Sequence, residues 1–149
     1  MEEEKNFNFF RFEDLRIYHK ALDYAIWVKN VTKDFPEHEI RGLAYHFSRA
    51  AQFIAINIAE GSGRNKGQFI YCLKMGKSSI RECVVLTTLA KKFGYIDESA
   101  EEYSRNELIE MTKMIGALIS SLQKSTRSNS GSHDNVNDDD DDDFDNTVN

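Results

Sequence analysis

The chain has 149 residues, one proline and a formal net charge of −6, and this length fits a single domain. All 19 Lys and Arg and 17 of the 25 acidic residues lie within residues 1–127, so this body carries +2, whereas residues 128–149 carry −8. Helix-forming residues throughout an almost proline-free body favour the all-α class, and no apolar run is long and uninterrupted enough for a transmembrane helix.

The N-terminus and the cysteines indicate a cytoplasmic protein. Residues 1–7, MEEEKNF, are acidic and polar and do not fit a signal peptide. Cys72 and Cys83 would lie about 16 Å apart along one predicted helix, too far to pair with each other. We interpret both as buried free thiols in a reducing compartment.

The first helix is expected from about Glu13 to Asp34, with an acidic first turn that suits the helix dipole. Phe12 lies just outside and is placed to pack back on the helix as a staple. Pro36 follows the helix, and the residue before a proline avoids the helical region. Its apolar stripe is Leu15, Tyr18, Leu22, Ala25 and Ile26.

The second helix is expected to begin between Glu37 and Ile40 and to end at Glu60, with Gly61 as a left-handed cap. Within residues 43–61, Arg49 is the only Lys, Arg, Asp or Glu before Glu60. A surface helix normally keeps a polar face, so this one predicts self-association. Its core stripe is Ile40, Leu43, Phe47, Ala50, Ala51, Ile54 and Ile58, and a second apolar face carries Tyr45, Phe53 and Ile56.

Residues 62–67 are expected to form a loop before a third helix, from about Gln68 to Phe93, that stops at Gly94. Within this helix, Gly76 indicates either close approach of a neighbouring helix or a tolerated glycine. The predicted inward face is Phe69, Leu73, Gly76, Ile80, Cys83, Thr87 and Ala90.

The fourth helix is expected from Glu98 to Lys124, with Asp97 as its N-cap. Its apolar stripe is Leu108, Met111, Ile115, Leu118, Ile119 and Leu122. Four helices with short loops predict an up-down-up-down antiparallel four-helix bundle over residues 12–125, after an N-terminal extension of residues 1–11.

Residues 126–149 form an acidic tail that is expected to be disordered, because like charges repel and little apolar surface is available to bury. As a polyanion mimic the tail could compete for a basic surface, or it could merely aid solubility. The sequence favours solubility, since that role requires no specific site.

No pattern predicts catalysis, a cofactor or a metal site. None of the four histidines, His19, His38, His46 and His133, follows a glutamate by three residues as in di-iron bundles, and the two cysteines lack zinc-ligand spacing. Polar residues on otherwise apolar helices are interpreted as a structural network that fixes helix register or a subunit interface. They are Arg49, Asn57, Glu60 and Glu82.

The third helix carries the strongest functional signal, a row of basic residues that we call the cationic stripe. Its members are Lys66, Lys74, Lys77, Arg81, Lys91 and Lys92. At 100° per residue they fall within a sector of about 100°. Glu82 is the only acidic residue between Lys66 and Phe93, and it lies off that sector. Such a stripe is typical of a polyanion-binding surface, although an ordinary solvated helix face has a similar composition.

The segments FEDLRIYHKA, FPEHEIRGLAYHFSRAAQFIAINIAEGSGR and KSSIREC resemble those of the 23S rRNA intervening sequence proteins, which are small four-helix bundles. The resemblance runs from about Phe12 to Leu122 and is most specific from Arg49 to Gly61. It implies proteins encoded in insertions within bacterial large-subunit rRNA genes. A related branch, the accessory variability proteins of diversity-generating retroelements, forms pentameric rings, binds nucleic acid through basic surfaces and associates with a reverse transcriptase.

Two functions follow as expectations. The first is a non-catalytic homo-oligomer, a pentamer by resemblance, that binds RNA or DNA through the cationic stripe. The second is a protein-interaction scaffold, for example for a reverse transcriptase, that makes no direct contact with nucleic acid.

Overall fold

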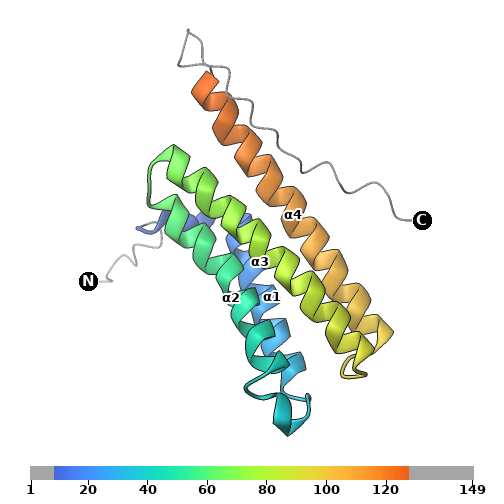
Figure 1. The fold of residues 1–149 in the computed structure, drawn as a ribbon. Coiled ribbons are helices and arrows are strands. Elements are labelled where there is room, and N and C mark those ends of the chain that lie inside the picture. The colour runs from blue at the N-terminus through green and yellow to red at the C-terminus, as the bar shows by residue number, and fades with distance from the viewer. Residues whose placement is uncertain (1–8, 128–149) are drawn as a thin grey trace, which may run out of the picture.

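The computed structural model describes residues 9–127, which contain helices and no strand. Two short 3-10 helices, η1 (Arg11–Asp14) and η2 (Glu37–Glu39), precede α1 and α2 respectively. The four long helices are α1 (Arg16–Thr32), α2 (Leu43–Ser62), α3 (Lys66–Lys92) and α4 (Glu98–Arg127). Consecutive helices run antiparallel (Figure 1), and the predicted all-α four-helix architecture is confirmed.

The ends of α3 and α4 follow from local capping chemistry. The Asn65 side chain accepts a hydrogen bond from the backbone N–H of Gln68 at 2.9 Å, so α3 begins at Lys66, inside the predicted loop. Gly94 adopts φ of +79° and ends α3, as predicted. The side chain of Asp97 accepts from the backbone N–H of Ala100 at 2.8 Å, which confirms the predicted N-cap of α4.

The first helix differs from its prediction in start and in rotation. Leu15 is extended, so α1 begins at Arg16, and Glu13 and Asp14 belong to η1. The Phe12 ring does pack back, 5.0 Å from the ring of Tyr18. Ile26, predicted inward, is 59% exposed. The fully buried core residues of α1 are Ile17, Ala21, Tyr24 and Val28, and the predicted Leu15, Tyr18, Leu22 and Ala25 pack only partly buried at the edge of the core.

The second helix begins later than predicted. Leu43 is its first residue, and the Glu39 carboxylate accepts a hydrogen bond from the Leu43 N–H at 3.2 Å. Ile40 therefore lies outside α2 and is 62% exposed, so its predicted place in the core was wrong. The other six residues of the predicted core stripe are buried.

Gly61 is not the left-handed cap that the sequence predicted. It lies inside α2, which ends at Ser62, and it is buried. A Cβ at Gly61 would lie 2.6 Å from Cβ of Cys72 and 2.9 Å from Cδ2 of Phe69, both on α3. The glycine is therefore required by close packing of α2 against α3. By contrast, a Cβ at Gly76 would find Asn57 and Ile115 at 3.8 Å, an ordinary contact.

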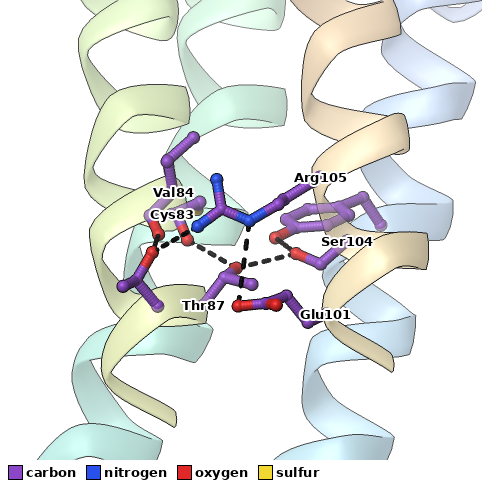
Figure 2. A network of polar contacts seen from close by, with 8 residues as sticks. Cys83, Val84, Thr87, Glu101, Ser104 and Arg105 are labelled. Carbon is purple, nitrogen blue, oxygen red and sulfur yellow. Dashed lines mark hydrogen bonds and ion pairs between the residues drawn. The ribbon is translucent and has the colours of Figure 1, made fainter. Parts of the chain in front are cut away.

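A chain of buried hydroxyl groups joins α1, α3 and α4 (Figure 2). Thr87 donates to the backbone oxygen of Cys83 at 2.7 Å, and its oxygen lies 2.8 Å from the Ser104 hydroxyl. Ser104 in turn lies 2.8 Å from the hydroxyl of Tyr24. Because each hydroxyl has one proton, Tyr24 donates to Ser104 and Ser104 donates to Thr87. With these directions, each of the three hydroxyl groups donates one hydrogen bond and none is left without a partner.

Both cysteines are buried free thiols, as predicted. Burial, together with the nearby Glu82 carboxylate, raises the pKa of the Cys83 thiol to about 12. The thiol is therefore protonated and unreactive at neutral pH.

The close packing at Gly61 predicts the outcome of a matched pair of substitutions. Gly61→Ala is expected to lower the free energy of unfolding by about 1–3 kcal/mol, because the added methyl group overlaps the side chains of α3. Gly76→Ala, the same change at another buried helical glycine, is expected to be neutral or to stabilise by up to about 1 kcal/mol. Urea unfolding measures both, and equal losses would contradict the proposed packing constraint.

The hydroxyl chain predicts coupling between two helices. Ser104→Ala leaves Tyr24 without its acceptor and is expected to cost about 1–3 kcal/mol. Tyr24→Phe removes a donor only and is expected to cost less. The double substitution should cost less than the sum of the singles by about 0.5 kcal/mol or more. Strict additivity in thermal or urea unfolding would show that the chain contributes no coupling.

Candidate nucleic-acid interface

The cationic stripe runs along most of α3, which spans 27 residues. From Lys66 to Lys92 it covers about 39 Å at the helical rise of 1.5 Å per residue. Lys66, Arg81 and Lys92 are exposed, and the other three are half-buried. The half-buried members present aliphatic stems to the protein surface and can still extend their charged ends toward solvent.

Contacts with α4 place the stripe on the flank of α3 that adjoins that helix. Lys66 Nζ donates to the hydroxyl of Ser125 on α4. Thr88, whose helical angle falls in the same sector as the stripe, accepts from Arg105 of α4 at 2.6 Å. The same arginine lies 3.8 Å from the carboxylate of Glu101 (Figure 2). Arg105 could not be identified from the sequence, because its proximity to α3 depends on tertiary packing.

The predicted second apolar face of α2 is open to solvent in the single chain. Tyr45 is 49% exposed, Phe53 36% and Ile56 50%. Arg49 links two of these side chains, since it donates to the Tyr45 hydroxyl at 3.0 Å and its guanidinium lies 5.1 Å from the Phe53 ring centroid. These four residues are called the α2 outer face below.

Two hollows flank the α2 outer face. One, of about 780 Å³, lies between α2 and the end of α1 and includes Phe35, Tyr45 and Ile56 in its lining. The other, of about 690 Å³, lies between α2 and α3 and includes Phe53, Met75 and Val85. Arg49 lines both. The exposed apolar surface is thus recessed on each side of one arginine.

The four residues of the predicted polar network are not joined within one chain. Glu60 forms an ion pair with Arg64 at the end of α2, and this hydrogen bond raises the pKa of Arg64. Asn57 donates to the backbone oxygen of Phe53 at 2.8 Å. Glu82 makes no hydrogen bond or ion pair with any described residue. It lines the α2–α3 hollow with Arg49 and Asn57, so three of the four share one recess and a network role across subunits stays a prediction.

Within residues 9–127, no three His, Cys, Asp or Glu side chains are grouped so that they could hold a metal ion. None of the helices described is both long and apolar enough to span a membrane.

The model of the 23S rRNA-intervening sequence protein family matches residues 13–117. The chain belongs to this family. The match includes the whole cationic stripe and the α2 outer face, and it ends within α4. A search of curated proteins finds no match to the chain.

Proposed function

We propose that the protein is a non-catalytic homo-oligomer that binds RNA or DNA through the cationic stripe of α3. The observation that carries the proposal is the stripe itself, six cations in one sector of a 27-residue helix with Glu82 outside that sector. Family membership is consistent with an RNA-related role, because the family is described by its link to 23S rRNA.

The dimensions of the stripe suit a nucleic-acid backbone. Phosphates of one strand repeat every 3.4 Å along a duplex, so about 39 Å of helix spans roughly eleven of them. Six cations could neutralise about half of those phosphates. Side chains of this type contact phosphates and do not read base edges, so the proposed binding depends on charge more than on sequence.

Self-association is supported by the α2 outer face. Aromatic and aliphatic side chains that are one third to one half exposed lie between two recesses of one surface. An apolar surface of this kind marks an interaction site in a soluble protein. Repetition of the stripe around an oligomer would multiply the number of phosphate contacts, and the pentamer implied by the resemblance is one such arrangement.

The stripe predicts a salt-dependent affinity that one set of substitutions weakens. In the full chain, changing Lys74, Lys77 and Arg81 to Gln should reduce the slope of log K against log salt by about 3 for a duplex, at roughly 0.9 per phosphate contact. Electrophoretic shift or fluorescence anisotropy with rRNA fragments and unrelated duplexes measures this slope.

The matched control removes the same charge from α1 and its C-cap by changing Arg16, Lys29 and Lys33, all exposed, to Gln. It should leave the slope nearly unchanged. Equal effects of both triple substitutions would mean that binding follows net charge alone. Absence of binding at about 50 mM salt, by a full-length variant in which the six aspartates 138–143 are changed to Asn, would end the proposal.

The α2 outer face predicts a variant that loses self-association without losing its fold. The double substitution Phe53→Ser and Ile56→Ser should convert the oligomer to a single subunit in sedimentation, because it removes apolar side chains from the proposed interface. The fold should survive, because both side chains are already exposed within the single chain. Ile26→Ser is the control, since Ile26 is 59% exposed but lies on α1. A wild-type protein that sediments as one subunit at high concentration would contradict the prediction.

A second function is favoured by the recesses themselves, whose aromatic and charged linings suit a protein ligand. In this alternative the protein is a scaffold for another protein, for example a reverse transcriptase, and touches nucleic acid only through that partner. Pull-down after nuclease treatment separates the two. A partner that survives the nuclease and is lost with the Phe53 and Ile56 variant supports the scaffold.

A further inference from the structure

We propose that the acidic segment of residues 128–149 binds the cationic stripe of its own chain and competes with nucleic acid for it. The competition rests on the proposed function, whereas the docking of the segment on α3 can be measured without any nucleic acid. The sequence alone favoured a solubility role for this segment, because it offered no specific site. The contacts between α3 and α4 supply one.

Helix α4, which the acidic segment follows in the sequence, ends beside the end of α3 where the stripe begins. Helix α4 ends at Arg127, and Ser125, two residues earlier, accepts a hydrogen bond from Lys66. Lys66 is both the first residue of α3 and the first cation of the stripe. Because α3 and α4 are antiparallel (Figure 1), the stripe extends away from this point along the flank of α4. The chain therefore leaves the bundle beside its own basic surface.

The distances allow the acidic run to reach the centre of the stripe. Asp138 lies eleven residue steps after Arg127, and an extended chain of eleven steps spans at most about 36–40 Å. Along α3, Lys74 lies about 12 Å from Lys66 and Arg81 about 22 Å. The six consecutive aspartates, 138–143, can thus lie over Lys74, Lys77 and Arg81 without full extension of the connecting residues.

The charges of the two elements are opposite in sign and similar in number. Residues 128–149 contain eight aspartates and no Lys or Arg, and the stripe contains six cations. Consecutive carboxylates present closely spaced single negative charges, as a phosphate backbone does. A ligand tethered to the same chain acts at an effective concentration in the millimolar range, so even a weak electrostatic contact competes with nucleic acid at lower concentrations.

Zero-length carbodiimide cross-linking of the full chain, followed by mass spectrometry, tests the docking directly. Links are expected from Asp138–Asp143 to Lys74 or Lys77. Isotope-labelled and unlabelled chains are mixed, and the links should join residues of one isotope. Links spread equally to Lys29 and Lys33 at the C-terminal end of α1, links only between chains, or no links would each overturn the docking.

Nucleic-acid affinity tests the competition. Changing Asp138–Asp143 to Asn keeps the length of the segment and should raise the affinity for duplex RNA or DNA about tenfold at about 50 mM salt. The gain should shrink at higher salt, because the contact between segment and stripe is screened as well. It should also shrink when Lys77→Gln and Arg81→Gln are combined with the Asn segment, since the docking site is then weakened.

The outcomes separate the two proposals. Equal affinity of the wild-type and Asn-segment proteins overturns the competition while leaving the binding function in place. A gain that persists fully in the Lys77 and Arg81 background shows general repulsion and overturns docking on the stripe. If neither protein binds nucleic acid at low salt, the binding function fails, and the cross-links still decide whether the segment docks.

Discussion

Helix α3 is held from two sides, and these contacts fix its rotation about its own axis. On one side the missing side chain of Gly61 lets α2 approach until Cys72 and Phe69 occupy the space of a Cβ. On the other side Thr87 joins Ser104 of α4 and Tyr24 of α1 through buried hydroxyl groups. A rotated α3 would lose the close packing of Cys72 and Phe69 against Gly61 and would leave a buried hydroxyl without a partner. The unsatisfied hydroxyl alone costs about 1–3 kcal/mol.

This fixed rotation sorts the surface of the bundle into two regions with different chemistry. The cations lie on the flank of α3 that adjoins α4, where Lys66 and Thr88 both contact α4. The α2 flank of α3 receives Met75 and Val85, which share a recess with Phe53. A basic region and an apolar region on separate sides allow a molecule to self-associate through one and bind a polyanion through the other. Self-association would then leave the cations accessible.

Local rules were sufficient for much of the fold. Short-range chemistry predicts Asp97 as the N-cap of α4 and Gly94 as the end of α3. Helical periodicity predicts the core stripe of α2 from Leu43 onward. The rotation of α1 could not be predicted in this way, because its apolar residues form two overlapping stripes, and the choice between them depends on the helices that cover it. Tyr24 was missed for the same reason, since its burial needs Ser104 from a helix eighty residues away. Gly61 suited a helix end by sequence, whereas its packing against Cys72 is a tertiary constraint.

The candidate site likewise combines features that the sequence predicts with features that depend on tertiary packing. The grouping of six cations in one sector is a property of helical periodicity and is visible in the sequence. Three features depend on how α3 and α4 pack: the position of the cations beside α4, the added proximity of Arg105, and the contact of Ser125, near the end of α4, with Lys66. Glu60, which the sequence placed in one network with Glu82, instead forms a local ion pair with Arg64, four residues later.

Lysine footprinting tests the central claim most directly. The protein is acylated with and without duplex RNA at low salt, and modification of each lysine is measured by mass spectrometry. We expect nucleic acid to protect the stripe lysines, Lys66, Lys74, Lys77, Lys91 and Lys92, and to leave Lys29 and Lys33 unprotected. Protection confined to α1, or equal protection of all lysines, would contradict the placement of the nucleic-acid site on α3.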